Sequence, residues 1–273
     1  MTTRATFSFG RNWKNYVRNS ADEKALLDAV SSLKEFGTEI AGKTFVDIGC
    51  GSGLFSLAAL EMGAARVISF DADPNSVDAS LLLREKFRAK HPNWDISHGS
   101  ILDEQLVKKL EGGGDVVYSW GVLHHTGDMY AAVRNAARLV KDGGTFIIAI
   151  YNHGPGSRFW EKVKIFYNRF PALAPLVLAA YLLTFGLYTA VRRSRTDPSA
   201  LRERGMNLYY NAVDWLGGYP YEYACFEEIK AFVEKLGFEL TLAPTILPCG
   251  RNERPSFRLS NTGCNEFVFV KKN

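Results

Sequence analysis

Apolar positions along this chain predict an alternation of buried strands and helices. Between Asp22 and Phe36 they recur at helical spacing, which predicts an amphipathic helix before the first strand. Short apolar runs bounded by Gly, Pro or Asp predict the strands. The strands are expected at the start of Lys43–Phe55, over Ala65–Phe70 and Asp95–Ser97, at the start of Asp115–His125, and over Thr145–Tyr151, Phe238–Leu242 and Asn265–Lys271. Further helices are expected from near Asn75, over Met129–Leu139 and over Phe226–Leu236. The pattern predicts an α/β domain.

The first predicted strand runs into a turn with alternating glycines, Gly49, Gly51 and Gly53, just after Asp47. Glycine lets a backbone adopt positive φ and approach a ligand closely, and the helix that follows offers free N–H groups. The dinucleotide fingerprint has its third glycine three residues after the second, so the spacing here differs. The strand and turn resemble those of the class I S-adenosylmethionine-dependent methyltransferases. The resemblance implies S-adenosylmethionine as cofactor, bound by Asp47 and the three glycines.

An acid ends the second predicted strand. Asp71 lies about 20 residues past the glycine turn, where doubly wound folds place the carboxylate that holds a ribose. We therefore expect Asp71 and the adjoining Ala72 to bind the cofactor. Asp73, just before Pro74, is expected to cap the next helix instead.

The segment after the third strand, His98–Asp103, resembles the part of the family that flanks the adenine. The resemblance implies that Ser100 and Ile101 make this contact. Methyltransferases often carry an acid where Ser100 stands, so Asp103 or backbone atoms are an alternative. Asp103 is equally well interpreted as a helix cap.

Asp115–His125 resembles the family motif that faces the transferred methyl group, which implies that the backbone of Ser119 and Trp120 contacts the amino-acid end of the cofactor. Ligands bind at the carboxyl ends of strands in doubly wound sheets, so the histidines that follow are expected near the reaction. A neutral imidazole can accept a proton near pH 7. We predict His125 as the catalytic base, ahead of His124, with a backbone-bonded loop histidine as the alternative. Adjacent histidines alone predict no metal site.

The family resemblance implies a Rossmann-like, doubly wound seven-stranded sheet with an antiparallel last strand and a helical insertion after the fifth strand. It covers residues 43–151 closely and 225–273 by pattern only. Phe7–Tyr16 is expected to form a lid over the cofactor or to pack on the outer helices. The predicted segments are an N-terminal lid or helical segment at 1–42, the cofactor-binding core at 43–151, the insertion at 152–224 and the rest of the core sheet at 225–273.

Within the insertion, Phe170–Val191 holds no charged residue and is flanked by Arg169 and by Arg192, Arg193 and Arg195. Its length meets the roughly 20-residue requirement for crossing a bilayer. A single span is excluded, because it would put the two parts of one sheet on opposite membrane faces. A hairpin or helix in the membrane interface is favoured, with contact over 170–195. A buried cap helix or a dimer interface is the alternative.

Aromatic and charged residues gather in Arg202–Tyr223, a composition typical of a ligand pocket with apolar walls and few polar groups. A Gly-Gly-Tyr-Pro turn with tyrosines packed on the core is the alternative. Glu266 is a further candidate for the same cleft. The residues predicted to contact the acceptor are Tyr151, Arg204, Asp214, Trp215, Tyr221 and Glu222.

Composition adds few constraints. A chain of 273 residues with 47% hydrophobic content can bury a full core, and a net charge of +4 does not indicate nucleic-acid binding. The four cysteines lack metal-site spacing and fit a reducing cytosol, and Met1–Asn19 lacks the apolar run of a secretory signal. We expect a cytoplasmic protein, with a peripheral position on the inner membrane face as the alternative.

The predicted function is S-adenosylmethionine-dependent O-methylation of a small-molecule or lipid-linked acceptor. Asp115–His125 is most similar to the ubiquinone-biosynthesis O-methyltransferases, except that His124 stands where those enzymes usually carry Glu. An RNA-modifying methyl- or carboxymethyltransferase is an alternative, because the tRNA wobble-uridine enzyme has a related core. The apolar insertion argues against nucleic acid. A non-catalytic S-adenosylmethionine-binding protein is a third hypothesis.

Overall fold

The computed structural model describes residues 9–87, 93–186, 202–203, 206–251 and 263–273. In this part of the chain, seven strands form one sheet in the order β3-β2-β1-β4-β5-β9-β8. Strands β1 to β5 pair in parallel, whereas β9 runs antiparallel to both β5 and β8. The predicted Rossmann-like sheet with an antiparallel last strand is therefore confirmed. The strands are β1 Thr44–Ile48, β2 Arg66–Asp71, β3 Trp94–His98, β4 Gly114–Trp120, β5 Val140–Tyr151, β8 Phe238–Leu242 and β9 Cys264–Lys271.

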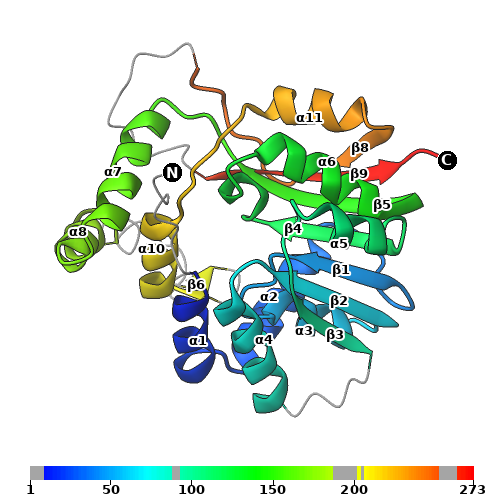
Figure 1. Ribbon diagram of the computed structural model, residues 1–273, viewed down its shortest axis with the longest axis horizontal. Coiled ribbons are helices and arrows are strands. Elements are labelled where there is room, and N and C mark those ends of the chain that lie inside the picture. The colour runs from blue at the N-terminus through cyan, green and yellow to red at the C-terminus, as the bar shows by residue number, and fades with distance from the viewer. Residues whose placement is uncertain (1–8, 88–92, 187–201, 204–205, 252–262) are drawn as a thin grey trace.

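Helices cover both faces of this sheet (Figure 1). One buried cluster joins the sheet to α5, α6 and α11, and another joins it to α1, α2, α3 and α4. Several helices begin at an aspartate whose carboxylate accepts a backbone N–H of the first turn, as at Asp22, Asp73 and Asp128. The cap predicted at Asp73 is confirmed. The helices are α1 Phe9–Asn19, α2 Glu23–Lys34, α3 Leu54–Glu61, α4 Pro74–Lys86, α5 Glu104–Leu110, α6 Met129–Leu139 and α11 Phe226–Glu234.

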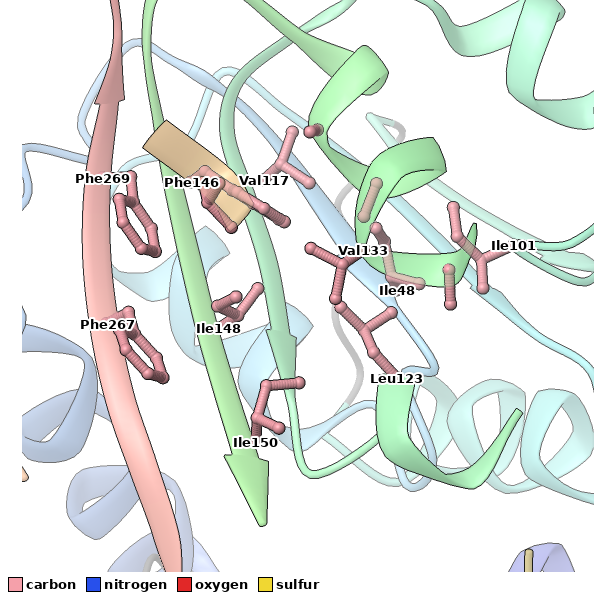
Figure 2. Close-up of a cluster of buried hydrophobic side chains, with 14 of the residues drawn as sticks. Ile48, Ile101, Val117, Leu123, Val133, Phe146, Ile148, Ile150, Phe267 and Phe269 are labelled. Atoms are coloured by element: carbon pink, nitrogen blue, oxygen red, sulfur yellow. The ribbon is translucent and has the colours of Figure 1, made fainter. Parts of the chain in front are cut away.

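The core beneath α6 is built from the central strands. Figure 2 shows Phe146 and Ile148 of β5 beside Phe267 of β9, with Val133 of α6 packed over the sheet. These side chains are fully buried. Burying an aromatic or branched side chain contributes roughly 1.5–3 kcal/mol to stability. This packed layer of side chains fixes the central strands, and the candidate site lies at the carboxyl ends of those strands.

One strand boundary differs from the sequence prediction. The strand was expected to begin at Thr145, but it begins at Val140, so Lys141–Gly144, whose residues are typical of a turn, belong to β5. Val140 pairs with Gly114 of β4, and the register shifts before Val116 pairs with Thr145. Gly143 has a φ of 71°, so the strand contains an irregularity where the turn residues lie.

Between β5 and α11 the chain forms a small helical layer of its own. Its elements are α7 Ser157–Arg169, α8 Ala174–Tyr181, the π-helix η2 Leu182–Gly186, the short strands β6 Arg202–Glu203 and β7 Met206–Asn207, and α10 Leu208–Gly217. Trp160, Tyr167, Leu216 and Tyr221 form the buried centre of this layer. Among the described helices, none has both the length and the apolar character needed to cross a membrane. The division into four segments remains a prediction.

Two of the cysteines form a disulfide, which the sequence analysis did not predict. Cys225 and Cys249 are bonded with their Cα atoms 5.2 Å apart, while Cys50 is a buried thiol. The two partners are 24 residues apart in the sequence and carry no spacing signal, so only the fold brings them together. Cysteine usage therefore does not support the expected reducing compartment.

Candidate active site

The glycine turn after β1 has the backbone that the sequence pattern requires. Gly49, Gly51 and Gly53 have φ values of 71°, 55° and 79°, a region that side chains with a Cβ rarely adopt. A Cβ on Gly49 would also lie 2.3 Å from the Val122 side chain. The Gly49 N–H donates to the Phe70 carbonyl at 2.8 Å, which fixes the turn against the end of β2.

Asp71 lies beside this turn at the end of β2. Its Oδ2 accepts the Gly51 N–H at 3.0 Å and its Oδ1 accepts the Asp73 N–H at 2.8 Å. Burial raises the pKa of Asp71 above its ordinary value, and the two backbone donors partly oppose that rise. Each carboxylate oxygen keeps acceptor capacity, so ribose hydroxyls can still bind. The carbonyl of Ala72 lies 3.0 Å from Nε2 of His98.

Asp47 lies deeper, at the centre of the sheet. It is 3% exposed, and its Oδ2 accepts the Ser56 hydroxyl of α3 at 2.5 Å. The Ser56 hydroxyl also lies 2.7 Å from that of Ser69 on β2. Burial raises the pKa of Asp47 to about 7 despite the hydrogen bond from Ser56. In this geometry Asp47 joins β1, α3 and β2, and a direct cofactor contact by its carboxylate remains a prediction.

The segment expected to flank the adenine is held by local contacts. Ser100 Oγ accepts the Leu102 N–H at 3.1 Å, and Ile101 is buried in the core. Asp103 accepts the Gln105 N–H at 2.9 Å and caps α5, as its helix-cap interpretation predicted. Both side chains are therefore engaged locally. Contact of Ser100 and Ile101 with the adenine remains a prediction, and it would be made by backbone or neighbouring atoms.

The end of β4 is fixed by two side-chain hydrogen bonds. Ser119 Oγ donates to the Ile48 carbonyl at 3.2 Å, and Trp120 Nε1 donates to Glu266 Oε1 at 2.7 Å. Glu266 Oε2 accepts the Thr245 hydroxyl at 2.6 Å. Glu266, a further candidate for the cleft, therefore orients the Trp120 indole. The backbone of Ser119 and Trp120 lies at the carboxyl edge of the sheet, where the fold binds ligands.

Helix α1 lies across this edge. A Cβ on Gly51 would lie 2.9 Å from Trp13 Nε1, so the indole rests against the glycine turn. The Gly10 N–H donates to Asp73 Oδ2 at 2.9 Å, and the ring of Phe9 lies 5.2 Å from that of His125. The described part of the segment predicted as a lid or packing element thus contacts the glycine turn, Asp73 and His125.

His125 has a defined tautomer. Its Nδ1 lies 2.5 Å from the Pro220 carbonyl, which can only accept, so Nδ1 carries the proton and Nε2 presents a lone pair. A Cβ on Gly218 would lie 3.0 Å from this Nε2, so Gly218 packs closely against the ring and a larger residue there would collide with it. Burial, assisted by the charge of Lys164, lowers the pKa of His125 to about 3. The ring is therefore neutral at pH 7.

His124 uses the opposite ring nitrogen. Its Nδ1 accepts the Tyr151 N–H at 3.2 Å, so Nε2 carries the proton. His124 is fully buried, and its Nε2 has no hydrogen-bond partner among the described residues. Burial, with smaller electrostatic contributions from His125 and Lys164, lowers its pKa well below the ordinary value. A buried N–H without a partner costs about 1–3 kcal/mol and is a ready donor for a ligand oxygen.

A fully buried lysine lies among three aromatic rings next to the histidines. Lys164 Nζ lies 4.0 Å from the ring centre of Trp215, 4.8 Å from Tyr221 and 5.6 Å from Tyr151, and it donates to the Trp215 carbonyl. Tyr151 in turn lies 3.9 Å from the His124 ring. Burial lowers the pKa of Lys164 to about 7. The predicted acceptor residues Tyr151, Trp215 and Tyr221 therefore surround the Lys164 side chain.

Asp214 of α10 completes this group. Its Oδ1 is buried and has no hydrogen-bond partner in the described ranges. Burial raises the pKa of Asp214 to about 7, the nearby Lys164 charge lowers it, and Asp71 raises it. Because both charges act on it, Asp214 lies within electrostatic reach of the predicted ribose acid and of Lys164.

One predicted acceptor residue, Glu222, does not join the group. Both carboxylate oxygens of Glu222 accept the Met129 N–H, at 3.3 and 3.1 Å, so Glu222 caps α6. The Glu222 N–H donates to the His124 carbonyl at 2.9 Å. Glu222 therefore positions the histidine turn, the 3-10 helix η1 Leu123–His125, from outside. Arg204 lies outside the described residues.

Sequence reasoning missed Lys164 altogether. In the sequence, Lys164 cannot be distinguished from the exposed basic residues Arg158 and Lys162 of the same helix. Its inward position depends on how α7 is oriented on the rest of the protein, which the structure shows. The described residues hold no group of three or more metal-ligating side chains.

The strand order, the glycine turn and the acid at the end of β2 define a class I methyltransferase core. The model of the methyltransferase domain family matches residues 19–212, and the chain belongs to this family of S-adenosylmethionine-dependent methyltransferases, whose cofactor is S-adenosylmethionine.

Similar proteins agree with this assignment. Ribosomal protein L11 methyltransferase from Aeromonas hydrophila is 59% identical over 44 residues, which are 16% of this chain and 15% of that protein. The Bacillus cytotoxicus protein of the same name is 30% identical over 158 residues, 52% of this chain and 47% of that protein. The chain thus spans less than half the length of these relatives.

Two solved structures share the fold. Magnesium protoporphyrin IX methyltransferase from Synechocystis PCC 6803, with bound SAH, superposes with a TM-score of 0.52 at 16% identity over 97% of this chain and 95% of that one. An S-adenosylmethionine-dependent methyltransferase from Mesorhizobium loti gives a TM-score of 0.51 at 16% identity, over 88% and 96%.

Proposed function

We propose that this protein transfers the methyl group of S-adenosylmethionine to an oxygen atom of a small-molecule or lipid-linked acceptor. The observation that carries the proposal is the histidine pair. His125 presents a lone pair at Nε2, and His124 presents a buried N–H, at the carboxyl edge of the sheet. Neutral imidazoles in these two tautomers suit a hydroxyl that must lose a proton while its oxygen is held.

The residues proposed to hold the cofactor line the same edge. Asp71 would accept hydrogen bonds from the ribose hydroxyls, and the glycine turn would lie along the methionine portion. Asp47, Ala72, Ser100, Ile101, Ser119 and Trp120 complete the proposed set, mostly through backbone atoms or by fixing the strand ends. The bound cofactor supplies an electrophilic methyl group on a sulfonium, which is a good leaving group.

The chemistry proposed for the chain is limited to alignment and proton transfer. The acceptor oxygen forms a bond to the methyl carbon as the carbon–sulfur bond breaks, and the hydroxyl proton passes to His125 Nε2. General-base assistance of this kind contributes about 10²- to 10⁴-fold in rate. The lowered pKa of His125 keeps the nitrogen unprotonated, although it also makes it a weaker base.

Acceptor binding is proposed for the aromatic group of Tyr151, Trp215 and Tyr221, with Asp214 and Lys164 as polar contacts. Asp214 Oδ1 and His124 Nε2 lack partners in the described part of the chain, so together they offer an acceptor and a donor. Such a site fits a ligand with an apolar body and a few hydrogen-bonding groups. Glu222 contributes by holding the histidine turn, and Arg204 remains a predicted contact.

The similarity to ribosomal protein L11 methyltransferases supports a second candidate, methylation of a protein acceptor. The alternatives of RNA methylation or carboxymethylation, and of cofactor binding without transfer, also remain to be tested. The location, cytoplasmic or peripheral at a membrane, stays a prediction.

One labelling experiment separates these candidates. Purified protein is incubated with methyl-labelled S-adenosylmethionine and a cell extract, and the products are partitioned into organic, aqueous small-molecule, protein and RNA fractions. We expect label in the organic or small-molecule fraction, as a base-stable methyl ether. We expect the His125→Ala variant to lose at least 100-fold of this transfer while keeping its cofactor affinity, with His153→Ala as control. Label confined to protein or RNA would refute the proposed acceptor, and full activity of the His125 variant would refute the base.

A further inference from the structure

Helices α7 and α8 are two-sided. On their inner sides, Trp160, Tyr167 and Leu178 pack against α10 and Tyr221. On their outer sides large apolar residues are exposed, and α8 has no buried residue at all. Leu176 and Leu183 are 68% and 71% exposed. The exposed large apolar residues of α7, α8, the turn between them and η2, together called the α7–α8 face, are Phe159, Ile165, Phe166, Phe170, Leu173, Leu176 and Leu183.

The same face carries basic but little acidic charge. Arg158, Lys162 and Arg169 are exposed on α7, and their spacing of four and seven residues places them on one side of the helix. The acid of α7, Glu161, accepts the Tyr223 hydroxyl at 3.5 Å, on the side of the buried cluster. In the sequence, Arg192, Arg193 and Arg195 follow the apolar segment.

This face lies at the outer edge of the molecule. In Figure 1, α7 and α8 lie at the left, with α10 between them and the sheet. The sheet and its helices bury their apolar residues in other clusters, so folding of the core does not require this exposed face. An exposed apolar patch rimmed by polar residues marks an interaction surface.

We propose that the α7–α8 face binds the surface of a bilayer that contains anionic phospholipids. The leucines and phenylalanines enter the boundary between head groups and acyl chains, and the arginines and lysine contact lipid phosphates. Long basic side chains extend from an apolar face toward head groups in this way. The helices lie in the interface, which agrees with the absence of a membrane-crossing helix among the described residues.

A second copy of the chain fits this face less well than a lipid surface. A two-fold dimer would place the same patch on both partners, so Arg158, Lys162 and Arg169 would oppose basic residues with little acidic charge to pair with. Anionic head groups supply the missing negative charge. The proposal goes beyond methyl transfer, since binding requires no turnover.

The test is sedimentation with vesicles. We expect the protein to bind vesicles of phosphatidylcholine mixed with the anionic lipid phosphatidylglycerol, and to bind pure phosphatidylcholine vesicles much less. The double variant Leu176→Ser/Leu183→Ser should bind roughly tenfold more weakly. The variant Arg158→Gln/Lys162→Gln/Arg169→Gln should lose roughly fivefold in vesicle affinity for each charge removed. High salt should weaken binding of the unmodified protein in the same way.

The matched control is Leu27→Ser on α2, because Leu27 is 67% exposed on a different helix. Circular dichroism and cofactor affinity check that each variant is folded. No binding to anionic vesicles, or equal binding by the leucine double variant, would overturn the proposal. Conversion of a dimer to a monomer by that variant, without vesicle binding, would assign the face to a second copy. None of these outcomes affects the methyl-transfer proposal, and failed transfer would leave vesicle binding intact.

Discussion

Two adjacent histidines in this protein present opposite chemistry because different ring nitrogens are engaged. Pro220 fixes the proton of His125 on Nδ1, whereas the Tyr151 N–H fixes the proton of His124 on Nε2. The pair therefore offers one lone pair and one N–H side by side, with ring centres 4.5 Å apart. Protonating either ring would break this division, since a charged imidazole only donates.

Acid should therefore destabilise the protein through these rings. The unfolded-state pKa of histidine is about 6.5, and burial lowers the pKa of His124 well below that value. Below pH 6.5 the unfolded state binds more protons than the folded state. The contribution is present above pH 6.5 and is lost as the pH falls towards the folded pKa, by up to about 1.4 kcal/mol per pH unit for one ring.

We expect the variant His124→Gln, which keeps an acceptor for the Tyr151 N–H, to lose less stability than the wild type between pH 6.5 and 5. Urea unfolding at both pH values measures the difference. Asp47 and Asp214 have raised pKa values and act with the opposite sign, but they are common to both proteins and cancel. Parallel losses in the two proteins would show that His124 does not titrate on unfolding.

At the scale of elements, local rules were sufficient for the core. The strand ends were predicted within a residue or two because β-branched and aromatic runs end at Gly, Asp or Pro, and Asp73 was identified as a cap before Pro74. The predicted start of β5 was wrong. The sequence Lys-Asp-Gly-Gly normally predicts a turn, but pairing of Val140 with Gly114 of β4 keeps this segment in the sheet. Tertiary hydrogen bonding overrode local turn preference there.

Helix α1 is the element whose role the sequence left open. Trp13 rests against Gly51, and Lys14 anchors the helix to Asp78 of α4 at 2.7 Å. When the cofactor approaches the glycine turn, a helix in this position would have to move away or close over it. We therefore expect α1 to control how fast the cofactor leaves.

We expect Trp13→Ala to raise the dissociation rate of S-adenosylhomocysteine by about fivefold to tenfold. Removing the packed indole weakens the contact of α1 with the glycine turn by a few kcal/mol, and only part of that loss favours opening of the helix. Displacement of labelled ligand, followed by rapid filtration, gives the rate. Arg18→Ala, an exposed change on the same helix, is the control. An unchanged rate would make α1 a packing element alone.

At the scale of the whole molecule, the candidate site divides into two parts of different origin. The cofactor edge comes from residues 44–120, a continuous stretch whose motifs are local and therefore visible in the sequence. The acceptor group joins η1, the end of β5, α7 and α10, so its geometry depends on how the insertion folds back. For that reason Tyr151, Asp214, Trp215 and Tyr221 were predicted by composition alone, and Lys164 was not predicted.

This division leads to a separable effect for Lys164→Met. Methionine fills a similar volume, but it removes the Lys164 charge next to the buried Asp214 and is expected to cost stability, so circular dichroism checks that the variant is folded. The Lys164 cation acts on Asp214 and on both histidines, whereas the glycine turn and Asp71 belong to the other part. We expect cofactor affinity to stay within about twofold and kcat/KM for the labelled acceptor to fall at least tenfold, the loss of roughly one charge-assisted hydrogen bond of 1.5–3 kcal/mol.

Calorimetry and initial rates measure the two quantities, and Lys109→Met on α5, where the lysine is exposed, is the control. If cofactor affinity fell together with kcat/KM, the two parts of the site would be coupled, and Lys164 would position the whole edge of the sheet instead of the acceptor.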